Sequence, residues 1–197
     1  MADIPFLNPA ILKQLDLPVP SRETTPQLLE KLNLNRPYAP SIEIQSYRRL
    51  YGLDTLNCEH WQGFIEMPLF KLHVQAFQPK LPPQDKVKGT VVLLHGYLEH
   101  SGIYQPIIQE ILEQGFSVLT YDLPGHGLSN GSPASIQDFD HYQQVLHAVH
   151  QYVRHASQLP KPWLGIGQST GGAIWLHHLL EFAERREDPY VERVLLL

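Results

Sequence analysis

Cysteine is almost absent from this sequence: Cys58 is the only one, so no disulfide can form within the chain. A protein without disulfides is typical of a reducing compartment, and we expect a cytoplasmic one. No apolar run approaches the roughly 20 residues of a membrane-spanning helix, and prolines interrupt the apolar stretches near the start. We therefore expect neither a transmembrane segment nor a signal peptide. At most, the sequence permits peripheral contact with the inner face of a membrane.

Basic clusters and metal-binding motifs are absent as well. The chain has 15 Lys and Arg against 20 Asp and Glu, with a formal net charge of −5, so we expect no nucleic-acid partner. The 11 histidines raise the question of a metal. His147 and His150 share the face of a predicted helix, but no third ligand is suitably spaced and no HExxH pattern occurs. We interpret both as solvated helix residues and predict no metal site and no cofactor.

The most informative stretch that is present is Gly-Ile-Gly-Gln-Ser-Thr-Gly-Gly at residues 165–172. Its Gly-x-Ser-x-Gly pattern centres on Ser169 and lies between a predicted strand (163–166) and a predicted helix (173–185). A strand that turns sharply into a helix at a serine is a nucleophile elbow, which exposes the hydroxyl at the helix N-terminus. Such a tight turn leaves no room for side chains beside it. We therefore predict that Ser169 is a nucleophile, supported by Gly167, Gly171 and Gly172.

A second motif lies upstream, where a continuous apolar strand predicted at residues 88–94 ends in His-Gly-Tyr. Acyl transfer requires two backbone N–H donors directed at the oxygen of the tetrahedral intermediate. We predict that one is the N–H of Thr170, the residue after the nucleophile, and that the other is the N–H of Tyr97, in the loop after this strand. Gly96 allows that loop to approach closely.

With these motifs, the sequence resembles the monoacylglycerol lipase and lysophospholipase group of α/β-hydrolases, which is also classified with the serine aminopeptidases. The resemblance rests on HGYLEHSGIY at residues 95–104, DLPGHGLS at residues 122–129 and the elbow, and it extends from about residue 58 to the last residue. It implies hydrolysis of a small lipid-like carboxylic ester through an acyl-serine intermediate, without a cofactor. It also implies a lid between strands six and seven, and that His95 shapes the oxyanion loop.

The sequence departs from this pattern after Ser169. In this fold the triad acid and then the histidine follow the nucleophile. His177 and His178 come too soon, because at ~1.5 Å per residue the helix carries them roughly 12 Å from Ser169. We interpret His95 and His126 as loop structure and not as substitute bases. We therefore expect an N-terminal part of a longer hydrolase, whose triad acid and base lie beyond the last residue.

We expect residues 1–57 to form a Pro-rich N-terminal extension, with short helices near 25–33 and 41–50, and residues 58–197 to form the N-terminal part of an α/β-hydrolase domain. Alternating strands and helices predict an α/β fold with a mostly parallel sheet and helices on both faces, truncated after about strand six. The predicted strands are 61–67, 70–77, 88–94, 116–121, 163–166 and 191–197, and the helices lie around 103–112, 139–152 (capped by Ser135) and 173–185.

We interpret the chain as part of a serine hydrolase that cleaves lipid esters of the monoacylglycerol or lysophospholipid type. Residues 1–197 alone are expected to be inactive, because the triad is incomplete. Two alternatives remain open: an aminopeptidase of the same fold, whose site for the free amine would lie mostly in the lid, and a non-catalytic truncated remnant. Acyl chain length, head group and oligomeric state are not indicated by the sequence.

Overall fold

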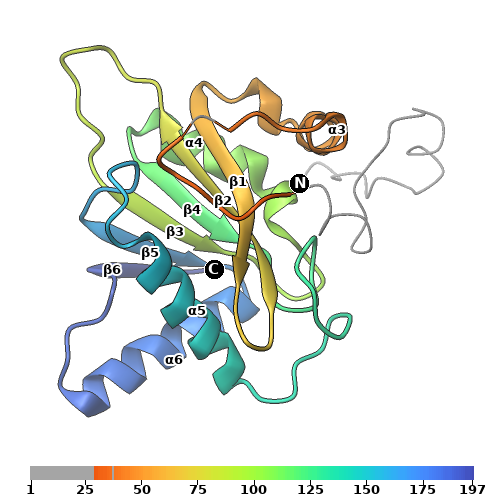
Figure 1. Ribbon diagram of the computed structural model, residues 1–197. Coiled ribbons are helices and arrows are strands. Elements are labelled where there is room, and N and C mark those ends of the chain that lie inside the picture. The colour runs from red at the N-terminus through yellow and green to blue at the C-terminus, as the bar shows by residue number, and fades with distance from the viewer. Residues whose placement is uncertain (1–28, 37) are drawn as a thin grey trace.

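The computed structural model describes residues 29–36 and 38–197 (Figure 1). In chain order its elements are α3 (Ile42–Leu50), η1 (Leu53–Thr55), β1 (Cys58–Glu66), β2 (Lys71–Pro79), β3 (Thr90–Leu94), η2 (Ser101–Tyr104), α4 (Gln105–Glu113), β4 (Ser117–Tyr121), α5 (Asp140–Val153), β5 (Trp163–Gly167), α6 (Thr170–Arg185) and β6 (Arg193–Leu196). The strands and helices predicted after residue 57 all form, with shifted ends. None of the described helices is both long and apolar enough to cross a bilayer.

The strands form one sheet in the order β1-β2-β4-β3-β5-β6. Strands β4, β3, β5 and β6 pair in parallel, whereas β2 pairs antiparallel with both β1 and β4. The predicted α/β fold is confirmed, with an antiparallel hairpin added at one edge. Because Leu94 of β3 and Leu196 of β6 both pair with Gly167 of β5, the carboxyl ends of these three strands meet at one edge of the sheet.

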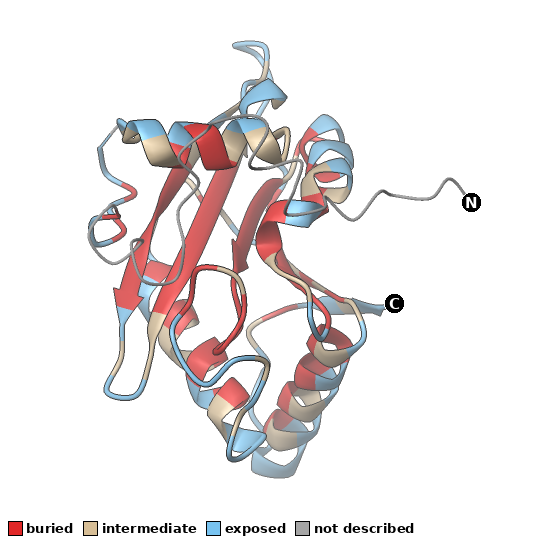
Figure 2. Cartoon of the chain, turned by 90° about the vertical axis from the view of Figure 1, so that its right-hand side faces the viewer, coloured by how far each residue is buried: buried red, intermediate tan, exposed pale blue. Residues whose placement is uncertain are grey.

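Helices cover both faces of this sheet, as predicted (Figure 1). On one face α5 and α6 pack against the strands, and on the other face α3 and α4 do so. Strands β2, β3 and β4 between them are buried almost throughout, as the red ribbon in Figure 2 shows. The apolar periodicity that predicted α4 and α5 corresponds to these two cores. Their members from the α-helices are Ile44, Tyr47, Ile108, Ile111 and Leu112 on one face and Tyr142, Val145, Leu146, Val149, Val153, Ile174 and Trp175 on the other.

The N-terminal extension differs from the prediction in part. The helix expected near 41–50 is confirmed as α3, and Ser41 caps it by accepting a hydrogen bond from Ile44 N. Of the helix expected near 25–33, residues 25–28 lie outside the described part, and residues 29–33 are extended. There Leu32 N donates to Phe64 O, and Phe64 N donates to Glu30 O, each at 2.9 Å. The helix prediction is wrong for these residues because the free edge of β1 offers backbone partners that a helix could not satisfy.

The cap predicted for α5 is also wrong. The helix begins at Asp140, and Ser135 lies before it in a turn, where its N–H donates to Ser132 O. Asp138 takes the role of a cap instead, because its Oδ1 accepts a hydrogen bond from Asp140 N at 3.0 Å. Aspartate and serine are comparable as acceptors at a helix start, so the sequence alone did not distinguish the two positions.

Strand β2 buries its polar face as well as its apolar one. His73 and Gln75 are fully buried, and His73 Nδ1 lies 2.8 Å from Oδ2 of the buried Asp122, which follows β4. The other oxygen of Asp122 accepts hydrogen bonds from Ser101 N and Oγ, at 2.8 and 2.6 Å. Burial by itself raises the pKa of Asp122, but the contact with His73 outweighs it and holds the pKa below its ordinary value.

This buried network also anchors α3. Arg48 Nε donates to Gln62 Oε1 at 3.1 Å, and the amide nitrogen of Gln62 lies 2.8 Å from His73 Nε2. A continuous series of hydrogen bonds therefore runs from the N-terminal extension, across β1 and β2, to the loop that follows β4. That loop also carries His126.

Candidate active site

Ser169 occupies the sharp turn between β5 and α6. It is the N-cap of α6, with φ 49° and ψ −109°, and its side chain is exposed. A non-glycine residue in so sparsely populated a conformation stores about 1–3 kcal/mol of strain, which the surrounding structure must offset. Gln168 N donates to Leu94 O at 3.0 Å and Ser169 N donates to Leu197 O at 2.9 Å, so β3 and the end of β6 hold the turn on both sides.

The glycines beside Ser169 lie where the turn leaves no room. A Cβ on Gly167 would lie 2.4 Å from the carbonyl carbon of Gly171, and a Cβ on Gly171 would lie 2.3 Å from Leu94 O. Gly172 is less crowded, because its nearest neighbour would be Gly167 O at 3.2 Å. The first helical turn therefore packs directly against the ends of β3 and β5, and this contact fixes the direction of α6.

The loop after β3 folds back against this turn. A Cβ on Gly96 would lie 2.7 Å from Glu99 Oε2 and 3.4 Å from the backbone oxygen of Gln168. Gly96 N donates to Glu99 Oε2 at 2.8 Å, and Tyr104 Oη also donates to that oxygen, at 2.5 Å. Sequence reasoning missed Glu99. The signal available to it was an acid three positions after the glycine of the His-Gly-Tyr motif.

The two predicted oxyanion donors lie on these adjoining segments, Tyr97 in the loop and Thr170 at the start of α6. Thr170 is the first residue of α6, where backbone N–H groups have no partner within the helix. Tyr97 is 53% exposed, and its hydroxyl donates to Ala134 O at 3.1 Å. Among the hydrogen bonds of the described residues, neither the Tyr97 N–H nor the Thr170 N–H has a protein acceptor. Both groups can therefore donate to a bound oxygen.

His95 is buried, and both of its ring nitrogens are engaged. Its Nδ1 lies 2.7 Å from Gly96 O, and its Nε2 accepts a hydrogen bond from Leu123 N at 2.9 Å. Burial lowers the pKa of His95 to about 4, which keeps the ring neutral at pH 7. The Nε2 lone pair that a general base would use is already occupied. These contacts fit the predicted role of His95 as loop structure.

The other histidines near this region are arranged differently. His126 Nδ1 lies 2.9 Å from Pro124 O, and its buried Nε2 has no hydrogen-bond partner within the described residues. Its ring lies 5.4 Å from that of His95 and 5.8 Å from that of Tyr97. His177 Nε2 lies 3.6 Å from an oxygen of Asp140 on α5, so that histidine is directed at the neighbouring helix.

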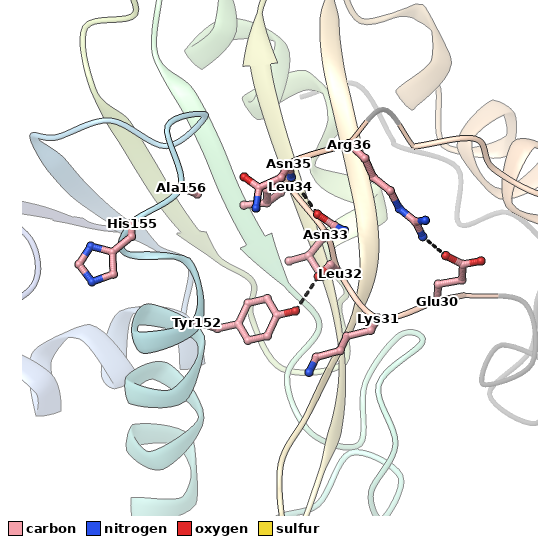
Figure 3. Close-up of a pocket in the computed structure, with 10 residues that line it drawn as sticks. All are labelled: Glu30, Lys31, Leu32, Asn33, Leu34, Asn35, Arg36, Tyr152, His155 and Ala156. Atoms are coloured by element: carbon pink, nitrogen blue, oxygen red, sulfur yellow. Dashed lines mark hydrogen bonds and ion pairs between the residues drawn. The ribbon is translucent and has the colours of Figure 1, made fainter.

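A cavity of about 720 Å³ lies elsewhere, between residues 30–36 and the end of α5 (Figure 3). Tyr152 donates to Leu32 O at 2.6 Å from one side of it, and Arg36 forms an ion pair with Glu30 at the other. The cavity is lined by Glu30, Lys31, Leu32, Asn33, Leu34, Asn35, Arg36, Tyr152, His155 and Ala156. None of the residues predicted for catalysis is among them.

Comparisons with known proteins show which family this sequence matches. The family model described as serine aminopeptidase, S33, matches residues 85–195, more than half of the chain. The caffeoylshikimate esterase of Arabidopsis thaliana is 32% identical over 117 residues, which cover 58% of this chain and 34% of that protein. The monoacylglycerol lipase of Mycolicibacterium smegmatis is 32% identical over 93 residues, which cover 47% of this chain and 32% of that protein. The chain therefore spans about a third of the length of these two relatives.

A solved structure supports the fold. The predicted CIB-like hydrolase from Thermoplasma acidophilum matches with a TM-score of 0.54 at 17% sequence identity, over 71% of this chain and 62% of that one. At this identity the likeness concerns the architecture of sheet and helices alone.

Proposed function

Because the chain belongs to the serine aminopeptidase S33 family of α/β-hydrolases, we propose that it carries the nucleophile and the oxyanion hole of a serine ester hydrolase. The observation that carries this proposal is the position of Ser169, which is exposed in a strained turn at the start of α6. The N–H groups of Tyr97 and Thr170, which have no acceptor within the described residues, support it. The names of the relatives support an ester as substrate, since they include an esterase and a monoacylglycerol lipase.

The proposed reaction is acyl transfer to Ser169 followed by hydrolysis. The Ser169 hydroxyl attacks the ester carbonyl and loses its proton to a general base, while the N–H groups of Tyr97 and Thr170 donate to the oxyanion. The intermediate collapses, the alcohol leaves with a proton, and water then hydrolyses the acyl-serine. Gly96 lets the loop of Tyr97 approach the turn, and Glu99 holds that loop through Gly96 N.

We propose that the general base and the acid of the triad come from residues outside 1–197. The engaged nitrogens of His95 support this, as does the direction of His177 toward α5. The substrate is proposed to be a small lipid-like ester, with access from the aqueous side of a membrane. The family description favours one competing function, removal of an N-terminal amino acid from a peptide.

The test uses the longer hydrolase that this proposal implies. Ser169→Ala should abolish hydrolysis of a p-nitrophenyl ester and labelling by a fluorophosphonate, and leave the circular dichroism spectrum unchanged. Ser157→Ala is the matched control, because Ser157 is also an exposed serine. Residual hydrolysis above about one hundredth of the original rate would exclude Ser169 as the nucleophile. Faster turnover of an aminoacyl p-nitroanilide than of the ester would favour the peptidase.

A further inference from the structure

A cluster of histidines lies between α5 and α6, apart from the nucleophile. His147 and His150 of α5 are half-buried instead of solvated as predicted, and the ring of His150 stacks on Tyr190 with centroids 3.6 Å apart. From α6, His178 and Glu181 face the same space. No metal was predicted here, because α5 alone offers no third ligand. The packing of α6 against α5 provides the ligands that one helix lacks.

Three of these side chains have the spacing of metal ligands. One donor atom each from His147, His178 and Glu181 lie within 4.8 Å of one another. His147 Nε2 and Glu181 Oε2 are 3.3 Å apart. Two ligands that lie about 2.0–2.1 Å from a tetrahedral zinc ion are about 3.3–3.4 Å apart, so this pair needs almost no movement.

His178 provides an independent observation. Its side chain is 0% exposed, and its Nδ1 has no hydrogen-bond partner within the described residues. Its Nε2 has only a long contact, from Tyr190 N at 3.3 Å. Buried polar atoms are nearly always satisfied, so an imidazole with one free nitrogen and one weak bond is a group that lacks a ligand.

The other two proposed ligands, His147 and Glu181, are oriented by contacts on the side away from the site. His147 Nδ1 lies 2.5 Å from the Tyr190 hydroxyl, and Glu181 Oε1 forms an ion pair with Arg185 at 2.6 Å. Metal-binding histidines and carboxylates are typically oriented by such outer partners. The contacts with Tyr190 and Arg185 leave His147 Nε2 and Glu181 Oε2 directed at each other.

We propose that His147, His178 and Glu181 form a zinc site that fastens α6 to α5. Two imidazoles and one carboxylate are a common zinc ligand set, and a water molecule would complete the tetrahedron. The side chains of His147 and Glu181 are 26% and 20% exposed, so an ion and its water can enter from solvent. The proposal does not depend on the ester hydrolase function.

The test is a titration of the chain with Zn²⁺, using a fused solubility domain without a histidine tag, and that domain alone as the blank. We expect one equivalent to bind and to raise the midpoint of thermal unfolding. Glu181→Gln and His147→Gln change partly exposed side chains and should each weaken binding at least tenfold. His155→Gln, at an exposed histidine outside the cluster, should leave the affinity unchanged.

Co²⁺ gives a second readout, because a tetrahedral site has strong visible absorption that an octahedral surface site lacks. We expect this absorption from the unchanged chain and its loss in Glu181→Gln. Three outcomes would overturn the proposal: no binding of Zn²⁺ at about 100 μM, less than a twofold change of affinity in both cluster variants, or an equal loss in His155→Gln. His178→Ala is not used alone, because it also opens a cavity in the core.

Discussion

Replacing Gly171 by alanine tests whether the first turn of α6 packs as tightly as the geometry indicates. The added methyl would lie 2.3 Å from Leu94 O, 2.7 Å from Leu94 C and 2.8 Å from Leu94 Cβ. Leu94 ends the central strand β3, so it cannot move aside without disturbing the sheet. Overpacking a rigid site costs about 1–3 kcal/mol, and a clash with backbone belongs at the upper end. We expect about 3 kcal/mol, roughly a 150-fold loss in the ratio of folded to unfolded chain.

Gly172→Ala is the matched control one residue further along the same helix. The closest atom to its methyl would be Gly167 O, at 3.2 Å, and alanine is favoured over glycine within a helix by up to about 1 kcal/mol. The two effects nearly cancel, so we expect a change of less than about 1 kcal/mol. Urea unfolding, followed by the fluorescence of the buried Trp163 and Trp175, measures both variants. If Gly171→Ala cost no more than Gly172→Ala, the tight elbow described here would be wrong.

Three further predictions concern the oxyanion loop, the edge of the sheet and the buried carboxylate. Gly96→Pro should reduce kcat of the longer hydrolase at least a hundredfold, because it removes the N–H that binds Glu99. Tyr97→Phe should change kcat little, since the proposed donor is a backbone group. Equal rates in the two variants would contradict the assignment. Residues 1–197 expressed alone should aggregate, because β6 is an edge strand with half-exposed leucines, and should label slowly with a fluorophosphonate, because the proposed base is missing. A soluble monomer that labels quickly would point to His126 as the base, because its Nε2 has no hydrogen-bond partner within the described residues. The pKa of Asp122 is lower in the folded state than in the unfolded one. The stabilising effect of this carboxylate is therefore present above the ordinary aspartate pKa of about 3.9 and is lost as the pH falls below that value. Asp122→Asn should flatten this part of a stability–pH curve, and an unchanged slope would refute the assignment.

Local patterns were sufficient for most of the fold. The apolar run before His95 and the strand–serine–helix pattern around Ser169 depend on neighbouring residues, and both predictions agree with the observed elements. The extended residues 29–33 were not predictable in this way, because their partner Phe64 lies far along the chain. The buried polar face of β2 was missed for the same reason: alternation indicates two faces, but it does not show that α3 will cover the polar one.

In the candidate site, too, local motifs were predictable and contacts between distant segments were not. Sequence spacing identified the residues that lie next to one another in a motif, and it placed Tyr97 and Thr170 on loops that the structure brings together at the ends of β3 and β5. It did not identify Glu99, because the contact with Gly96 N requires the loop to fold back. It also excluded a metal on the evidence of a single helix, whereas His178 and Glu181 approach from another.

The hydrogen bonds that anchor α3 have a direction, and that direction selects a tautomer. The Arg48 guanidinium can only donate, so it faces Gln62 Oε1, which turns the amide N–H₂ of Gln62 toward His73. His73 Nε2 must then accept, and its single proton must lie on Nδ1, toward Asp122. Arg48 thus selects the tautomer of a histidine with which it forms no hydrogen bond. These four positions are chemically interdependent, and we expect that homologous chains exchange them as a set and not one at a time.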